Sequence, residues 1–418
     1  MLSNHTRQEY ARELSVRYKA ASRSEKSRIL EEFCQTCGYN RKYAMGLLRN
    51  PPPLRKAPIK RPRATRYDAE VRRVLLQVWE MSNGLCSKRL VPFLPKLLDA
   101  LERHNELCVS APLSEKLLGI SAATVDRLLG SARRSHPMRG RSTTKPGTLL
   151  REQIRVRTEF AWDEQKPGYF EADLVAHCAE STAGEFLYTL TLTDIATGWT
   201  ECQPLLNRSQ IGVTQAIERI RTLLPFPIFG IDSDNGTEFI NHNLKRYCEE
   251  RNIEFTRSRP YKKNDQCHVE QKNWTVVRQH IGYARYEGVE EWRLLGSVHR
   301  WLRRHVNFFQ PSVKLLSKDR DQAKIRKRYD QAKTPYQRLI DYGILPKDTL
   351  QDLETFYLDL NPLDLLRQLS ASLNRLQKAQ IRRQQNTAAD PCKTSTERLI
   401  SVQKVTSNRM EPSEHEGS

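Results

Sequence analysis

The sequence lacks an apolar run that could cross a membrane, and it lacks a secretory signal. Its longest apolar stretches fall well short of the roughly 18 residues that span a bilayer. The first residues, MLSNHTRQEYAREL, carry charges where a signal peptide needs an apolar segment. These absences exclude an integral membrane protein, and we expect a cytoplasmic protein with no membrane partner.

Cysteine has no useful pattern either. The nine cysteines are scattered over 418 residues, unlike a disulfide framework, so we expect reduced thiols. Cys34 and Cys37 form the only CxxC, and no second CxxC or spaced histidine pair follows to complete a tetrahedral zinc site. A helix end with one buried thiol is the simpler interpretation of this pair.

Acidic residues are too few to balance the basic ones. The chain has 69 Lys and Arg against 49 Asp and Glu, a formal net charge of +20. Residues 1–150 carry a net charge of +16, residues 151–250 carry −7, and residues 251–350 carry +11. Because so uneven an excess is typical of a polyanion binder, the charge predicts binding to nucleic acid.

Residues 1–50 have a helical pattern that is typical of a helix-turn-helix domain. A helix over residues 26–34 is followed by a turn with Gly38 and by a second helix from Asn40, which presents Arg41, Lys42 and Arg49. An ordinary αα-hairpin is the alternative. Residues 51–67 are rich in proline and basic residues, and predict an extended linker that could follow a DNA groove through Lys56 and Arg61.

A second helical domain is predicted over residues 68–135. Its first helix has the apolar stripe Val71, Val74, Leu75, Val78 and Trp79. A second helix-turn-helix pattern follows Gly119 and Ile120, and its second helix presents Thr124, Arg127 and Arg133. Residues 136–157 have no clear period and predict another linker.

The pattern then changes to that of strands. Residues 168–176, 186–193 and 198–205 predict an antiparallel meander, and residues 227–232 and 253–257 predict two further strands. Helices are expected over residues 209–224, 242–251 and 268–281. The order βββαβαβα predicts a mixed five-stranded sheet flanked by helices, in a core over residues 158–285.

Three acids fall at informative places in this core. Asp173 lies in the middle of the first strand, Asp234 follows the fourth strand in the turn IDSDNGTEF, and Glu270 lies in the first turn of the last helix. Carboxylates that meet in a nearly dry cleft repel one another, and Mg²⁺ or Mn²⁺ relieves the repulsion through hard oxygen ligands. Two such ions would support phosphoryl transfer on a phosphodiester.

These residues resemble a known family. The segments GYFEADLVAHC, LTLTDIATGW, IDSDNGTEFIN and SRPYKKNDQCHVEQKNWTVVR, with 35 residues between Asp234 and Glu270, resemble the DDE transposases and retroviral integrases with a ribonuclease-H-like core. The nearest likeness is to bacterial insertion-sequence transposases with an integrase catalytic core, over about residues 140–345. The resemblance implies that Asp173, Asp234 and Glu270 are the catalytic, metal-binding triad and hold two Mg²⁺ or Mn²⁺ ions.

Other acids in the same segments have simpler explanations. Asp232 shares a strand face with the position of Asp234 and is a weaker alternative as a ligand. Glu171 is interpreted as a strand-edge acid, and Asp194 as the cap of an Asx turn. His268 lies about 200° around the helix from Glu270, which favours a loop or DNA contact over a catalytic base.

Several basic residues near this site are predicted DNA contacts. The loop that contains Arg259, Tyr261, Lys262 and Lys263 mixes basic and aromatic side chains, a composition suited to gripping a DNA end, with a solvated charge run as the alternative. The family often places a basic residue on the helix face of the glutamate. Here Lys272 is off that face and Arg278 is near it, and both are predicted to contact DNA.

The remainder of the chain is expected to be basic and then helical. Residues 286–350 predict a small basic DNA-binding module, for which a barrel-like form is expected. Residues 351–385 contain a leucine-rich helix that either pairs with a partner or packs within the chain. Residues 386–418 are polar and predict a disordered tail.

The sequence as a whole therefore predicts a multidomain DNA transposase. The helical front would bind the terminal repeats of a mobile element, and the core would cut the 3′ ends and join them to target DNA. Double-stranded DNA and further copies of the chain are the expected partners, in the bacterial nucleoid. A non-catalytic repressor derived from a transposase is the alternative, and a structure-selective nuclease is a third interpretation.

Overall fold

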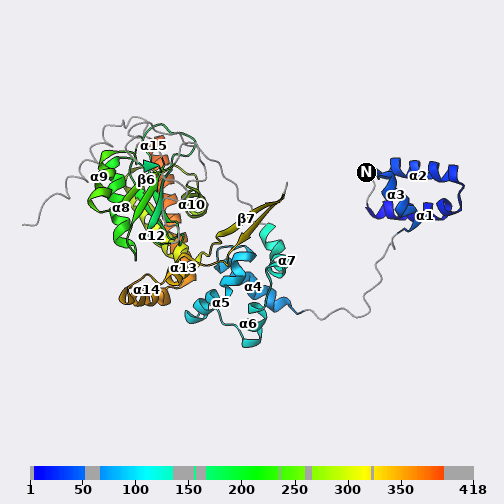
Figure 1. Ribbon diagram of the computed structural model, residues 1–418, viewed down its shortest axis with the longest axis horizontal. Coiled ribbons are helices and arrows are strands. Elements are labelled where there is room, and N and C mark those ends of the chain that lie inside the picture. Colours follow the sequence, from blue (N-terminus) through cyan, green and yellow to red (C-terminus); the bar gives the residue numbers. More distant parts are fainter. Residues whose placement is uncertain are drawn as a thin grey trace, which may run out of the picture. The chain divides into compact units, whose positions relative to one another are not determined.

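The computed structural model describes residues 4–51, 66–134, 155–156, 166–234, 236, 238–258, 266–321 and 324–389. The chain divides into two compact units, Met1–Arg66 and Tyr67–Ser418 (Figure 1). Among the described residues, no helix is long and apolar enough to cross a membrane. The predicted tail beyond residue 389 and most of both predicted linkers, including Lys56 and Arg61, lie outside the described residues.

The first unit is a three-helix module formed by α1 (Asn4–Ala20), α2 (Arg23–Cys37) and α3 (Arg41–Arg49). A capping box between Ser22 and Glu25 begins α2, and Gly38 ends it with φ of 70°, a left-handed conformation that favours glycine. Phe33 and Leu48 are fully buried in the small core between the helices. Cys37 is buried at the end of α2, as the sequence predicted.

The second unit begins with the helices α4 (Ala69–Met81), α5 (Ser87–Arg103), α6 (Ala111–Leu118) and α7 (Ala122–Arg134). The predicted apolar stripe of α4 is buried along its whole length. Residues 119–121 separate α6 from α7, and the Ser121 hydroxyl accepts a hydrogen bond from the Thr124 N–H (3.3 Å). The predicted helix boundaries therefore hold within a few residues.

The sheet of the core contains every predicted strand. These are β2 (Tyr169–Ala176), β3 (Tyr188–Asp194), β4 (Thr200–Leu205), β5 (Gly230–Ser233) and β6 (Glu254–Arg257). The order is β1-β6-β5-β2-β3-β4, with β2, β3 and β4 antiparallel and β1, β6, β5 and β2 parallel. The added strand β1 (Arg155–Val156) lies in a segment that was predicted to be linker, so that prediction was wrong there. Two residues are too few to show a strand period.

Helices cover both faces of this sheet. The helices α8 (Gln210–Leu223) and α9 (His242–Glu250) pack on the face that carries Phe170 and Ile231. The opposite face carries Val175 and is covered by helices that follow one another along the chain. These are α10 (Cys267–Lys272), the π-helical η1 (Asn273–Arg278), α11 (Gln279–Ile281), α12 (Gly288–Phe309) and, farther on, α15 (Pro362–Ala389).

The stretch predicted as a small basic module has a different structure. Among the described residues, it divides into α12, a hairpin of β7 (Leu315–Asp321) and β8 (Lys324–Tyr329), and α13 (Pro335–Tyr342). The expected barrel was wrong because the apolar face of α12 packs against β4 and belongs to the core. The basic excess concentrates on the hairpin, where Arg326, Lys327 and Arg328 are exposed.

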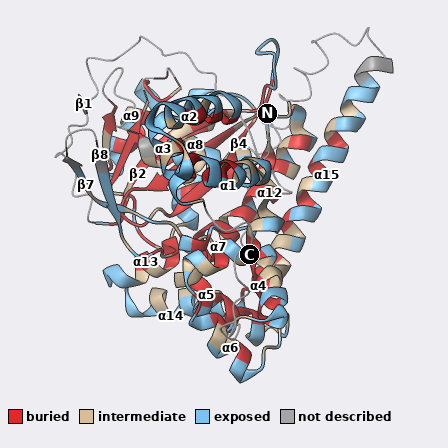
Figure 2. Cartoon of the chain, turned by 90° about the vertical axis from the view of Figure 1, so that its right-hand side faces the viewer, coloured by how far each residue is buried: buried red, intermediate tan, exposed pale blue. Residues whose placement is uncertain are grey.

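The final described helices pack within the chain. After α14 (Lys347–Asp359), the long helix α15 lies along α12, and its residues Leu365, Leu369 and Leu376 are buried (Figure 2). Arg383 of α15 pairs with Glu287 (3.0 Å) and Glu291 (2.7 Å) at the start of α12. Of the two explanations for the leucine-rich segment, the structure therefore favours packing within one chain.

Candidate active site

The strand register brings the two aspartates together. β2 and β5 run parallel, and Ser233, the last residue of β5, lies opposite Ala172 of β2. The next residue along each strand is Asp234 or Asp173, so the two acids are neighbours across the sheet. The Gly236 N–H donates to Asp234 Oδ1 (2.9 Å), and a Cβ on Gly236 would lie 2.7 Å from the Glu238 carboxyl carbon. A side chain at this position would require the Glu238 and Asp234 carboxylates to move.

The helix α10 is fixed against β2 by side chains on the same strand face. Glu171 is fully buried and accepts hydrogen bonds from the backbone N–H groups of His268 and Val269, both at 2.9 Å. A carboxylate that accepts from the N–H groups of the first helical turn stabilises the start of the helix. One turn later, Asn273 Nδ2 donates to Asp173 Oδ2 (2.7 Å). The helix that carries Glu270 is therefore held in register with Asp173.

The acids of this site act on one another electrostatically. Burial raises the pKa of Asp173 to about 8, and the charges of Asp234, Glu270 and Glu238 contribute in the same direction. Burial also raises the pKa of Asp234 to about 6, with a contribution from Glu238 and an opposing one from the Gly236 N–H. Carboxyl groups that resist ionisation because of one another are suited to a shared cation.

The donor set fits a hard divalent cation. Asp173 and Asp234 offer adjacent carboxylate oxygens, the ligands that Mg²⁺ and Mn²⁺ prefer, and Glu270 is exposed on the neighbouring helix. In the described part of the chain, no three acid, imidazole or thiol groups stand close enough together to hold one ion. Asp173 and Asp234 would therefore be the first residues to hold the metal, with Glu270 as the third acid within electrostatic reach of Asp173.

The other acids of the core have structural partners. Asp232 is fully buried and accepts a hydrogen bond from the Thr256 hydroxyl of β6 (2.6 Å). Asp194 accepts hydrogen bonds from the Thr197 N–H (2.7 Å) and from the Gly168 N–H (2.8 Å). It therefore caps the turn after β3, although through the N–H three residues on and not the N–H two residues on of the predicted Asx turn. The prediction for Glu171 was wrong. β2 is an interior strand of the sheet, so Glu171 does not lie at a sheet edge. Its carboxylate caps the start of α10 instead.

The predicted DNA contacts near the site differ in their surroundings. The guanidinium of Arg278 donates to the Ala176 carbonyl (2.8 Å) and lies over the Tyr283 ring, so it supports the fold locally. Lys272 is half-buried, and burial lowers its pKa to about 8. Arg259, Tyr261, Lys262 and Lys263 lie outside the described residues.

The predicted contacts in the helical regions are mostly accessible. Lys42 and Arg49 are exposed on α3, and Arg41, also exposed, donates to the Ser27 hydroxyl (2.8 Å). On α7, Arg127 is exposed and donates to the half-buried Thr124 hydroxyl (3.0 Å). Arg133 pairs with Asp126 and lies over the Trp79 ring. Its contacts fasten α7 to α4, which leaves this guanidinium less available than the others.

Sequence reasoning did not identify two polar residues of the site. Asn273 follows Glu270 by three positions, so a search of the next helical turn would have found it. Glu238 acts on both aspartates from the loop after β5. Its position two residues after Gly236 gave no periodic signal, because the chain there is neither strand nor helix.

Comparison with known proteins agrees with this reading of the core. A family model described as the integrase core domain matches residues 163–263. The y4rM protein of Sinorhizobium fredii (strain NBRC 101917 / NGR234), described as uncharacterized, is 44% identical over 339 residues. The alignment covers 81% of this chain and 96% of the relative. This chain belongs to the y4rM family and contains an integrase core domain. The resemblance to integrases and transposases of the DDE type is confirmed.

Two solved structures are also similar to part of this chain. One is the cryo-EM structure of the simian T-cell lymphotropic virus intasome in complex with PP2A regulatory subunit B56 gamma, with 16% identity and a TM-score of 0.25. It is matched over 44% of this chain and 59% of that chain. The other is the crystal structure of the catalytic core domain of BIV integrase, with 15% identity and a TM-score of 0.28. The match covers 46% of this chain and 98% of that chain. At such scores the fold assignment depends on the strand order described above.

Proposed function

We propose that this integrase core protein is a DNA transposase that cuts the 3′ ends of a mobile element and joins them to target DNA. The observation that carries the proposal is the register of β2 and β5, which makes Asp173 and Asp234 neighbours in an integrase core domain. Glu270 is the third acid of the proposed triad, because its charge acts on Asp173. The proposed substrate is double-stranded DNA.

The residues of the chain have separate tasks in the proposed reaction. Two divalent ions, when bound, would activate the attacking oxygen and stabilise the leaving oxygen of the phosphodiester. Asp173 and Asp234 would hold the cations, and the Asn273 amide fixes one oxygen of Asp173 so that its carboxylate keeps its orientation. Glu171 holds the start of α10, and thereby the position of Glu270 relative to the sheet.

The helical regions are the proposed readers of the element ends. The surface of α3 presents Lys42 and Arg49, and the surface of α7 presents Arg127. Both helices follow a short turn after another helix, the arrangement in which a recognition helix enters a major groove. The net charge of +16 over residues 1–150 would supply the salt-dependent part of the affinity.

The proposal extends to assembly on DNA. Transposition joins two ends, and the −7 charge of residues 151–250 would repel DNA unless cations and basic segments surround the site. We therefore expect a dimer or a larger assembly on paired ends. Mass photometry of the full chain with and without terminal DNA would contradict this expectation if a complex of one chain with one end persisted at saturating protein and Mg²⁺.

One experiment tests the proposed reaction. The full chain is incubated with Mn²⁺ and the DNA ends that flank its own gene, and nicked and joined products are scored on a sequencing gel. Nicks at the 3′ ends followed by joined products are the expected result. Tight, specific binding of the ends with neither product would favour the alternative of a repressor that has kept only the DNA-binding regions. Cleavage without joining would favour a nuclease.

A further inference from the structure

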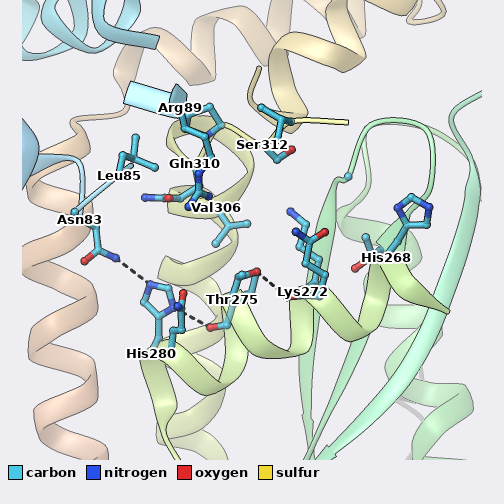
Figure 3. A pocket seen from close by; sticks show the side chains of 18 of the residues that line it. Asn83, Leu85, Arg89, His268, Lys272, Thr275, His280, Val306, Gln310 and Ser312 are labelled. Carbon is cyan, nitrogen blue, oxygen red and sulfur yellow. Dashed lines mark hydrogen bonds between the residues drawn. The ribbon is translucent and has the colours of Figure 1, made fainter. Parts of the chain in front are cut away.

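A cavity of about 470 Å³ lies beside α10, and its lining includes none of the three acids of the proposed active site (Figure 3). Its walls come from the loop and helix after α4, from the end of β3, from α10 to α11, and from the ends of α12 and α15. The volume falls within the roughly 300–1,000 Å³ of typical ligand pockets. Glu270 is not among its lining residues, although His268, Gln271 and Lys272 of the same helix are.

The cavity is basic. Lys272, Arg89 and Lys314 contribute cationic side chains, and the described residues that line it include no Asp or Glu. Gln271, Gln279 and Gln310 add amide groups. Of the cations, Lys314 is already engaged, because its ammonium donates to the carbonyl groups of Ile195 (2.9 Å) and Ala196.

The other two cations are free to bind a ligand. No hydrogen bond or ion pair joins the Lys272 ammonium to any described residue, and the guanidinium of Arg89 has a single contact, from Nε to Cys86 Sγ (3.4 Å). Figure 3 shows both side chains directed into the same space from different elements. The two positive charges repel each other there, so an anion between them would be stabilised by both.

We propose that this cavity binds a phosphate group between Lys272 and Arg89. A phosphate supplies the acceptor oxygens and the negative charge that the lining lacks, and the amides of Gln271 and Gln279 can donate to its remaining oxygens. The chemistry is shared by a backbone phosphate of DNA and by a free phosphate compound. The structure favours the DNA backbone, because the cavity adjoins the helix of Glu270, and this choice of source rests on the proposed function.

The site also has a consequence for the arrangement of the second unit. Arg89 belongs to the helical region before the sheet, whereas Lys272 belongs to the integrase core. The two regions already touch at this cavity, where Asn83 Nδ2 lies 3.2 Å from His280 Nε2 and Gln310 Nε2 donates to the Ser82 carbonyl (3.2 Å). A phosphate bound between the two cations would fasten the helical region to the catalytic core.

The first test uses the full chain without DNA and without a divalent metal, so it does not depend on transposase activity. Pyrophosphate is titrated into the wild type and into Lys272→Gln, Arg89→Gln and Lys245→Gln by calorimetry. Lys245 is the matched control, since it lies on α9 and pairs with Glu249 (3.8 Å) away from the cavity. We expect the wild type and the control to bind alike, and each cavity variant to bind at least about tenfold more weakly.

The second test identifies the source of the phosphate. Terminal DNA is prepared with single neutral methylphosphonate linkages along the cleaved strand, and its affinity is measured for the wild type and for Lys272→Gln without metal. Weakened binding at one linkage in the wild type but not in the variant assigns the site to the DNA backbone. Pyrophosphate binding that depends on both cations, without such a linkage, keeps the site and assigns it to a free phosphate compound.

Two results would overturn the proposal. One is pyrophosphate affinity that is equal in the wild type and in both cavity variants. The other is a wild type that binds no pyrophosphate, together with the absence of any methylphosphonate linkage that weakens DNA binding in the wild type but not in Lys272→Gln. Circular dichroism of each variant guards against a trivial loss of folding. Because Arg89 and Lys272 lie on separate elements, a folding defect in one variant still leaves the other to decide.

Discussion

Two sets of acids in the core differ in what the chain provides to neutralise them. On β4, Glu201 is fully buried and receives the guanidinium of Arg303 (2.6 and 2.8 Å) and the indole N–H of Trp199 (2.8 Å). Asp173 and Asp234 receive only an amide and backbone N–H groups. In the described part of the chain, no Lys or Arg forms an ion pair with either aspartate.

The difference separates an acid that builds the fold from the two acids that are proposed to hold a metal. A buried charge is tolerated when a partner of opposite sign and further hydrogen bonds accompany it. Glu201 has both, so its charge is a permanent part of the structure. The raised pKa values of Asp173 and Asp234 show the cost of leaving two carboxylates without a cation, and a bound metal would remove that cost.

The largest expected effect tests the aspartates themselves. Asp173→Asn or Asp234→Asn should reduce strand cleavage and joining by about 10³-fold or more, because each change removes a metal ligand. Binding of terminal DNA should change little, since the proposed recognition helices lie elsewhere. Cleavage and gel-shift assays on the same preparations measure both quantities. Full activity in Asp234→Asn would refute the assignment of this residue, and inactivity of Asp232→Asn beside it would transfer the role to Asp232.

The opposite behaviour is expected of Glu201. Glu201→Gln leaves the Arg303 guanidinium without its carboxylate and should lower the free energy of unfolding by about 3–5 kcal/mol. Urea denaturation measures this change, and activity per folded molecule should be retained. A double variant, Glu201→Leu with Arg303→Leu, should recover part of the loss, since no unpaired buried charge remains. If Glu201→Gln were as stable as the wild type but inactive, the division between the two sets of acids would fail.

The sequence was sufficient to predict the pair Asp173 and Asp234. Strand periodicity located β2 and β5, and the apolar strand ending in a DNG turn fixed the position of the second acid. The carboxyl ends of the two strands are not aligned, because the end of β5 lies opposite the middle of β2, with Ser233 facing Ala172. These are the places at which the sequence located the two acids. Periodicity also predicted the helices on both faces, because each has a continuous apolar stripe.

The features that escaped prediction depend on contacts between distant segments. The partnership of Glu201 with Arg303 joins residues about a hundred positions apart, and no local pattern distinguishes it from a surface acid. The π-helical turn after α10, in which hydrogen bonds join residues five apart, covers only six residues, too few to change the helical pattern of the sequence there. The cavity at Lys272 forms only where the helical region and the core pack together, and a local pattern in the sequence does not reveal such packing.

The next effect concerns the amide that supports Asp173. Asn273→Ala removes the hydrogen bond to Asp173 Oδ2 and should lower the cleavage rate by about 10- to 100-fold, as for other residues that orient a metal ligand. The concentration of Mn²⁺ needed for half-maximal rate should rise, whereas DNA affinity should not. Asn273→Gln is the control, because it keeps an amide group that Asn273→Ala removes. A stability loss with an unchanged Mn²⁺ dependence would reduce Asn273 to a structural residue.

The raised pKa of Asp173 gives a stability prediction of definite sign. Its folded pKa of about 8 lies above the usual aspartate value of 3.8, so the folded state binds more protons than the unfolded state between about pH 4 and 8. Stability of the metal-free protein should therefore fall as pH rises through this window. Asp173→Asn should be more stable than the wild type at pH 8, by about 1–2 kcal/mol after allowance for solvent screening, and equal to it near pH 4.

Metal should reverse this difference between the two proteins. Adding Mn²⁺ at pH 8 should raise the melting temperature of the wild type, because the ion neutralises the carboxylates, and should have a smaller effect on Asp173→Asn. Differential scanning calorimetry with Mn²⁺ or with a chelator measures both. Equal melting temperatures for the two proteins at pH 8 without metal would mean that the Asp173 carboxylate carries no such cost.

The smallest expected effect has the opposite sign and comes from the core histidines. His299 is buried and lies 3.2 Å from the Thr189 hydroxyl, which also contacts His177 (2.8 Å). Burial lowers the pKa of His299 to about 3, below its usual 6.5, so the folded state binds fewer protons than the unfolded state between about pH 3 and 6.5. Its contribution to stability should be complete above pH 6.5 and should be lost on acidification, by about 0.7 kcal/mol between pH 7 and 6. His299→Gln can still form a hydrogen bond with Thr189 but does not titrate. Between pH 7 and 6 the wild type should therefore lose unfolding free energy relative to the variant. A difference that stays constant from pH 7 to 6 would show that His299 titrates alike in both states.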